Sequence, residues 1–385
     1  MDIKQATTAY ESWLGKQIPL IAADLKLKHQ RMTDGVFPFL RATFYRWAQL
    51  WPENCPDLVH APVALAVGDL HVENFGTWRD LEGRLVWGIN DFDEVCEMPY
   101  AVDLVRLATS ALLAASEGTA ACKAADACAA ILEGYTEGMQ RGGQPFVLAE
   151  RHHGLRALAL TELRDPVRFW EKLNQWPQAE NVPAGVKSLL ARALPESAVP
   201  EKIVHRQAGL GSLGRRRFTV IAQWRGGYMA REAKELVPSA WHWSDATQSA
   251  KIFYTTIITS AVRITDHTVL AQKQWLVRRL APDCSRIELN QLPQKRDELK
   301  LLHAMGYETA NIHLGTPNAV QKIIADLRKR PSRWLFNAAQ AMEWATINDW
   351  KQWRKASEPD LPIVTGARSA VKAGASNQIK KPGKP

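Results

Sequence analysis

Hydrophobic and polar residues follow two periods along the chain, and together these periods predict an α+β fold. The helical period runs over residues 1 to about 50, where Gly35 and Pro38 interrupt it. It returns between about 100 and 142, a segment rich in Ala and Leu, and again between 295 and 356. We expect the segment 100–142 to form a buried helical hairpin.

Short apolar runs predict strands in two separate parts of the chain. Residues 62–69 and 84–91 each form such a run that ends in an acidic residue, and a loop-like segment separates them. Residues 202–236 contain a glycine-rich turn and two β-rich runs around a Gly-Gly pair, which is typical of an antiparallel meander. A helix from about 246 to 264 and a strand pair across 268–280 are expected to follow.

These elements divide the chain into four segments. Residues 1–201 and 282–364 are expected to be mainly helical, whereas 202–281 is expected to form a small antiparallel sheet. Residues 365–385 are rich in Gly, Ser, Ala and Lys and are expected to form a disordered basic tail. A chain of 385 residues is long enough to build two or more lobes with a cleft between them.

The charge balance changes this picture little. A composition of 46% hydrophobic and 23% charged residues is that of a globular protein, and the formal net charge is +9. Residues 368–385 hold five basic residues and no acidic one, so 9 − 5 leaves +4 for the rest of the chain. This nearly balanced body argues against a specific nucleic-acid partner.

Cysteine usage and hydropathy point to a reducing compartment. The five scattered cysteines are an odd number, and the absence of a C-x-x-C motif argues against structural zinc. The first residues lack the apolar core of a signal peptide, and no run reaches 18 uncharged apolar residues. We therefore expect a cytoplasmic protein with no membrane span.

Two acidic motifs end the first pair of predicted strands. In VGDLHVENFG, Asp69 and Asn74 are five residues apart, and in GINDFDE, Asp91 and Asp93 follow the next strand. Phosphoryl transfer uses a carboxylate that accepts the proton of the attacking hydroxyl, together with amide and carboxylate oxygens that hold Mg²⁺. Each acid alone is more often a turn or cap residue, but both motifs in this order favour a catalytic loop and a metal site.

A third motif follows more than a hundred residues later. Gly209, Gly211, Ser212 and Gly214 belong to a full G-x-G-x-x-G, which is weak evidence by itself. A dinucleotide-binding version must open a helix, but here a β-rich run follows, so the loop joins two strands. That arrangement is the one in which a glycine flap covers nucleotide phosphates and the next strand carries a lysine, here Lys234. The alternative for Lys234 is a solvated residue on an edge strand.

The acidic motifs resemble those of the aminoglycoside phosphotransferase and choline kinase group. The whole set resembles more closely the bacterial family named domain of unknown function 2252, which belongs to the protein-kinase-like superfamily. The resemblance covers roughly residues 28–350. It is carried by Arg31-Met32 with PFLRAT, Asp69 to Gly76, Asn90 to Glu94, Asp103 to Leu107, Gly209 to Gly214 and Lys234-Glu235.

The resemblance implies a two-lobed kinase-like fold, with Asp69 as base, ATP under the glycine loop, and Mg²⁺ as the second cofactor. The order of the motifs is reversed relative to ordinary kinases, which implies a circular permutation in which residues 202–281 form the N-lobe. On that interpretation residues 303–314 resemble the helix that leads into the catalytic loop. Residues 246–264 contain no acidic residue to serve as the helix-C glutamate, so Lys234 needs another partner.

Two functional classes remain open from the sequence. The first is an ATP-dependent phosphotransferase that acts on a small hydroxyl-bearing molecule, and the second is a kinase-like nucleotide-binding regulator or nucleotidyl transferase. The motifs leave the acceptor and the oligomeric state undefined, because acceptor pockets are shaped by loops without transferable motifs. For Arg215, Arg216 and Arg217 beside the glycines, one interpretation is that they steer phosphate, and the favoured one is a solvated strand end.

Overall fold

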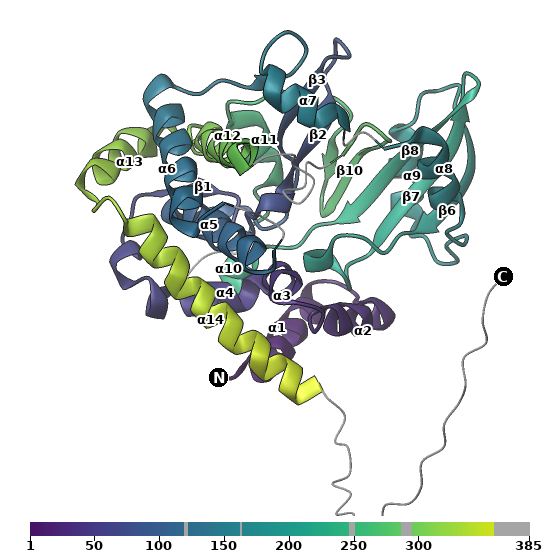
Figure 1. The fold of residues 1–385 in the computed structure, drawn as a ribbon. Helices are drawn as coiled ribbons and strands as arrows, with labels where there is room; N and C mark the ends of the chain where they lie inside the picture. The colour runs from purple at the N-terminus through teal and green to yellow at the C-terminus, as the bar shows by residue number, and fades with distance from the viewer. Residues whose placement is uncertain (119–121, 162–163, 246–250, 286–294, 358–385) are drawn as a thin grey trace, which may run out of the picture.

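The structure is a computed structural model that describes residues 1–118, 122–161, 164–245, 251–285 and 295–357. It is a mixed α+β protein, which confirms the expected class. Most helices gather on one side of the molecule, and the largest sheet lies on the other (Figure 1). The predicted tail lies outside the described residues.

The N-terminal segment is helical, as its period predicts. It forms α1 (Ile3–Gln17), α2 (Ala22–Arg31), α3 (Val36–Ala42), α4 (Phe44–Asn54) and a short 3₁₀ turn, η1 (Pro56–Leu58). The chain breaks between α2 and α3, where Gly35 is extended and precedes the first helical residue of α3. Asp2 and Gln5 begin α1 with a capping box, in which each side chain accepts from the other's backbone N–H.

Two small antiparallel sheets follow. β1 (Val63–Ala66) pairs with β4 (Cys96–Pro99), and β3 (Leu85–Ile89) pairs with both β2 (Phe75–Arg79) and β5 (Phe146–Val147). The runs 62–69 and 84–91 therefore contain strands, as expected. The segment between them was expected to be a loop, but β2 occupies part of it. Its apolar side chains are buried on both faces, so it lacks the alternating pattern that identifies a strand.

The predicted hairpin 100–142 is confirmed as α5 (Ala101–Ser116) and α6 (Ala124–Arg141). The C-terminal helices α12 (Lys295–His313), α13 (Pro317–Lys329) and α14 (Trp334–Ser357) pack around it (Figure 1). Helices α6 and α12 lie unusually close, since a Cβ on Gly134 would be 1.9 Å from the carbonyl oxygen of His303. Glycine at this crossing lets the two backbones touch.

Residues 199–280 hold a five-stranded antiparallel sheet in the order β6-β7-β8-β10-β9. Its strands are β6 (Val199–His205), β7 (Arg217–Trp224), β8 (Gly227–Glu235), β9 (Leu270–Gln272) and β10 (Trp275–Leu280). Arg225 and Gly226 both have positive φ in the β7–β8 turn, the conformation that a two-residue hairpin requires. The predicted meander and the strand pair across 268–280 are therefore confirmed.

Alternate residues of this sheet face two short helices. On one face, Phe218 of β7 and Val277 of β10 belong to an apolar cluster with α9 (Ala184–Arg192). On the other face, Ile221 and Leu280 of the same two strands belong to a cluster with α8 (Pro166–Asn174). This is the period of two that a strand covered on both faces requires. Helix α7 (His153–Thr161) precedes α8.

The helix expected from about 246 to 264 is wrong in extent. The structure forms α11 (Tyr254–Ser260), and residues 246–250 lie outside the described part of the chain. A separate short helix, α10 (Ala240–Ser244), begins at the N-cap Ser239. Beyond Ser260 the chain turns away from the helix, because Ala261 adopts an extended conformation.

Candidate functional site

The loop that follows β1 is held by a buried carboxylate on α5. Asp103 accepts hydrogen bonds from the backbone N–H groups of Val67 (2.7 Å) and Gly68 (2.8 Å), and His313 of α12 lies 3.0 Å from it. Gly68 has φ +83°, and a Cβ there would lie 2.5 Å from the carbonyl oxygen of Glu94. This close turn directs the chain to Asp69.

Asp69 lies against an arginine from α5. Arg106 Nε donates to Asp69 Oδ1 at 2.8 Å, and Arg106 Nη2 donates to the same oxygen and, at 2.8 Å, to the carbonyl of Leu40. Asn74, at the end of η2 (Val72–Asn74), donates its Nδ2 to the backbone oxygen of Asp69 at 2.9 Å. Burial raises the pKa of Asp69 to about 6, and Arg106 opposes this rise. Such a carboxylate can serve as a base near neutral pH.

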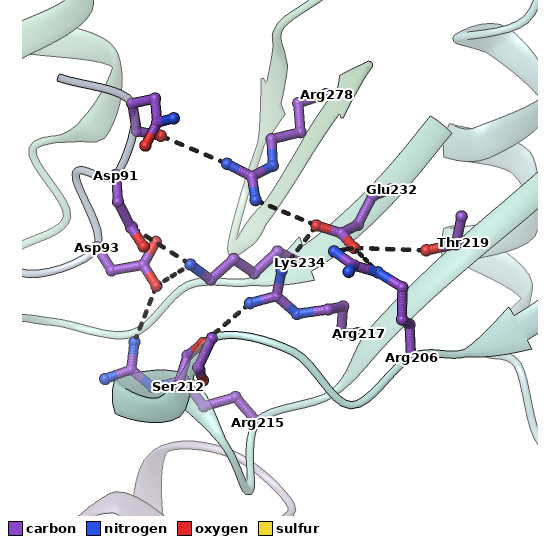
Figure 2. A network of polar contacts seen from close by, with 12 residues as sticks. Asp91, Asp93, Arg206, Ser212, Arg215, Arg217, Thr219, Glu232, Lys234 and Arg278 are labelled. Atoms are coloured by element: carbon purple, nitrogen blue, oxygen red, sulfur yellow. Dashed lines mark hydrogen bonds and ion pairs between the residues drawn. The ribbon is translucent and has the colours of Figure 1, made fainter. Parts of the chain in front are cut away.

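The second acidic loop meets the lysine of β8. Lys234 Nζ lies 3.4 Å from Asp91 Oδ1 and also contacts Asp93 Oδ2 (Figure 2). The partner that the lysine needs is therefore this acidic pair. Burial alone would raise the pKa of Asp91, but the charges of Lys234 and Arg278 hold it below its ordinary value. Burial and the neighbouring Asp91 raise the pKa of Asp93.

The glycine-rich segment lies directly over Asp69. It contains the 3₁₀ turn η3 (Leu210–Ser212), and a Cβ on Gly211 would be 3.3 Å from Asp69 Oδ2. Helix α2 covers the other side, where Lys28 Nζ donates to the Gly211 carbonyl at 3.2 Å. The same helix packs on Gly214, since a Cβ there would be 2.5 Å from Leu25. Helix α2 thus holds the glycine segment in place.

One cavity joins these segments. Its volume is about 50 Å³. The predicted site residues that line it are Asp69, Asn74, Asp91, Asp93, Gly209, Gly211 and Ser212. Gly214 and Lys234 are not among its lining residues, and Lys234 reaches the cavity through its contacts with the acidic pair.

The expectation of a solvated strand end at 215–217 is wrong. Arg215 and Arg217 are buried, and Arg216 is paired with Glu235. Arg215 Nη2 lies 2.8 Å from Glu94 Oε1, so it ties the glycine segment to the second acidic loop. Burial is possible because each buried guanidinium has a carboxylate partner, Glu94 from a distant segment for Arg215 and Glu232 from the neighbouring strand β8 for Arg217.

Arg217 belongs to a larger cluster around Glu232, which lies two residues before Lys234 on the same face of β8. Arg217 Nη1 lies 2.7 Å from Glu232 Oε1. Arg206 Nε lies 2.7 Å from Glu232 Oε2, and Arg278 Nη2 lies 3.3 Å from Glu232 Oε1 (Figure 2). Glu232 is fully buried. Three positive charges thus share one carboxylate beside the acidic pair.

Sequence reasoning missed Arg106, Lys28 and Arg215 as residues of this site. Arg106 carried a signal, because Asp103 and Arg106 are the only charged residues in the otherwise apolar segment 100–116. A buried arginine in such a helix needs a partner. Lys28 and Arg215 carried no comparable signal, since both lie in strongly charged stretches.

The acidic loop suits a hard cation. Asp93 Oδ1 is buried and accepts no hydrogen bond from any described residue, and Asp91 is its partner carboxylate. No group of three or more His, Cys, Asp or Glu residues that could hold a metal ion occurs in the described ranges. Asp91, Asp93 and Asn74 line one cavity and carry the kind of oxygen ligand that Mg²⁺ prefers, and in this structure Lys234 contacts both carboxylates.

The comparison with known families found a match, which supports a relationship to an uncharacterised bacterial family. Residues 20–165 match the model of a family described as "Uncharacterized protein conserved in bacteria (DUF2252)". The match supports the uncharacterised bacterial family to which the motifs point. It includes both acidic motifs and ends before the glycine-rich segment. Neither a curated protein nor a solved structure matches the chain.

In the part of the chain that the structure describes, no helix is both long enough and apolar enough to cross a membrane.

Proposed function

We propose that this protein is an ATP-dependent phosphotransferase with a kinase-like, circularly permuted arrangement. It would transfer a phosphoryl group to a hydroxyl group of a small molecule. One observation carries the proposal: segments 69–74, 91–93 and 209–212 are far apart in the sequence, yet residues of all three line one cavity. Base, metal ligands and phosphate-covering loop must all meet at one triphosphate, so this convergence is what the chemistry requires.

Residues in and beside the cavity have distinct roles in this reaction. Asp69 accepts the proton of the acceptor hydroxyl, and Arg106 positions its carboxylate. Asp91, Asp93 and Asn74 would hold Mg²⁺, which supplies charge neutralisation for the phosphates. Lys234 balances the acidic pair.

The permuted order of the chain is supported by contacts between its N-terminal part and α12 with the turn that follows it. The hydroxyl of Thr316, just after α12, accepts a hydrogen bond of 3.0 Å from the backbone N–H of Leu65 in β1. His313 of α12 lies against Asp103, which holds the turn before Asp69. A helix near the C-terminus therefore supports the loop near the N-terminus, as the kinase order of elements would demand.

A second function is favoured by a different observation. The cavity measures about 50 Å³, Asp69 is already paired with Arg106, and Lys234 is engaged by the acidic pair. A protein that binds a nucleotide to regulate a partner, without transferring any group, would need no room for an acceptor hydroxyl at Asp69.

The experiment is a phosphotransfer screen with ATP, Mg²⁺ and a library of hydroxylated metabolites. Asp69→Asn should lower transfer by roughly 10²-fold or more and leave ATP affinity nearly intact, which is the expected effect of losing a general base. Asp57→Asn, at an exposed position outside the cavity, is the matched control and should retain full transfer. A folded Asp69→Asn variant with full activity contradicts the base assignment. Tight ATP binding by the wild type without transfer to any acceptor, water or protein favours the regulatory function.

A further inference from the structure

A second cavity of about 470 Å³ adjoins the first one. The two share Asn90, Asp91 and Gly209 as lining residues, so the second cavity begins at the acidic loop and the glycine segment. Its volume is within the range of small-molecule sites, roughly 300–1,000 Å³. The first cavity at about 50 Å³ is far smaller, so a nucleotide-sized ligand of this site must extend into the second.

The lining of this second cavity is strongly positive. It includes six arginines and two acidic residues, so 6 − 2 gives +4. Two carboxylates outside the lining, Glu232 and Asp283, pair with several of these arginines. Counting them reduces the formal charge of the lining from +4 to +2. The arginines are Arg164, Arg206, Arg217, Arg263, Arg278 and Arg279. Such a lining suits an anion better than a neutral base or sugar, because guanidinium groups match the oxygens of phosphate in charge and geometry.

Arg263 gives the most specific indication of a ligand. Its guanidinium carbon lies 5.0 Å from the ring centre of Trp78 and 4.7 Å from that of Phe92, so two aromatic rings hold it. Its Nε and Nη1 are buried and donate no hydrogen bond to any described residue. Buried charged donors without partners are costly, and they are rare unless a ligand or water completes them.

Lys234 is poorly placed for the phosphates, because its Nζ contacts Asp91 and Asp93 and its side chain is only 2% exposed. Arg278, by contrast, lines the second cavity and donates to the carbonyl of Asn90 at 3.4 Å, beside the acidic loop (Figure 2). The cations that line the second cavity, into which a phosphate chain from Asp91 would extend, are therefore arginines.

We propose that the second cavity is an oligophosphate-binding subsite, in which Arg263 and Arg278 donate hydrogen bonds to phosphate oxygens and Asp91 marks the metal-binding end. Two ligands contain such an oligophosphate, the nucleotide and a phosphorylated acceptor. The choice between them rests on the proposed function.

The test is calorimetric titration of the full chain with inorganic tripolyphosphate in the absence of Mg²⁺. Arg263→Met should weaken binding at least about tenfold, the scale of one lost charge-assisted hydrogen bond. Arg263→Lys, which keeps the charge and the stem between the two rings but not the planar fork, should weaken it less. Arg333→Met is the matched control, since Arg333 is exposed, stacks on Phe336 at 4.8 Å and lies outside both cavities, and it should bind like wild type. Thermal denaturation of each variant verifies folding, and Arg263→Lys carries the test if Arg263→Met does not fold.

The results separate this subsite from the proposed function. Absence of tripolyphosphate binding by the wild type, or equal binding by wild type and both folded Arg263 variants, overturns the subsite even if phosphotransfer is found. Arg263-dependent binding without any phosphotransfer supports the subsite and counts against the phosphotransferase. Competition between ATP and tripolyphosphate supports the subsite with the nucleotide as the source, whereas simultaneous binding supports it with a phosphorylated acceptor as the source.

Discussion

Replacing Arg106 by Met removes the cation that lies against the candidate base. Arg106 is fully buried on α5, where it donates to Asp69 and to the Leu40 carbonyl and lies over Phe44 at 5.0 Å. Methionine keeps much of the apolar contact but none of the hydrogen bonds. The substitution therefore leaves the partly buried carboxylate of Asp69 without its charge partner.

The expected loss of stability is about 3–5 kcal/mol, the usual cost of removing one partner of a buried ion pair. For a chain of this size this corresponds to a fall in Tm of roughly 6–10 °C, at about 2 °C per kcal/mol. Arg141→Met is the matched control: Arg141 pairs with Glu137 at 2.7 Å on α6, but 71% of its side chain is exposed. It should cost less than about 1 kcal/mol.

The loss should depend on pH. Asp69 has a pKa of about 6 in the folded protein, raised by burial from 3.8, and Arg106 opposes that rise. Without Arg106 this pKa is higher still. A carboxyl group whose folded pKa exceeds its unfolded pKa penalises folding above the folded pKa, and the penalty fades as the pH falls toward the unfolded value. Arg106→Met should therefore be destabilised more at pH 8 than at pH 5.5.

The assay is thermal denaturation by circular dichroism at both pH values for wild type, Arg106→Met, Asp69→Asn and the double variant. Because Asp69→Asn removes the unpaired charge, the double variant should be more stable than the sum of the two single losses implies. The coupling is on the order of 0.5–3 kcal/mol. An equal loss at both pH values, together with additive effects in the double variant, would refute the reasoning.

Three further outcomes are expected. Asp91→Ala should remove most of the thermal stabilisation by ATP with Mg²⁺, about 2.7 kcal/mol at a ligand concentration of 100 Kd, and an unchanged Mg²⁺-dependent shift would transfer the metal assignment to Asp93 or discard it. Glu232→Ala should destabilise the chain by about 3–5 kcal/mol in urea denaturation, because three arginines lose their shared carboxylate; a loss below about 1 kcal/mol would show that they are solvated instead. Gly134→Ala should cost about 1–3 kcal/mol in the same assay, since its Cβ meets the His303 carbonyl at 1.9 Å, whereas Gly154→Ala, with open space around it, should cost nothing; equal effects would contradict the close helix crossing.

Helices and hairpins whose conformation depends on residues close by in the sequence could be predicted from that sequence. The hairpin of β7 and β8 follows from two β-rich runs around a glycine turn, and the helices α5 and α6 follow from an Ala- and Leu-rich helical period. The acidic motifs were identified for the same reason, since each is a short segment after a strand. Their roles as base and metal ligands stay predictions.

The pairing of charges was decided only in the tertiary structure. Lys234 meets Asp91 and Asp93 across more than 140 residues, and Arg106 meets Asp69 from a neighbouring helix. Any of the many carboxylates of the chain could have been their partner, because electrostatic attraction depends on distance and burial and not on sequence separation.

The same reason explains the error at the arginine run. A run of three arginines is ordinarily solvated, because burying a guanidinium is costly. Folding places Glu94 beside Arg215 and Glu232 beside Arg217, which offsets that cost. Local sequence determined where strands, turns and acidic loops form, whereas the packing of distant segments determined which of their charges are buried together, because only packing sets the distances between them.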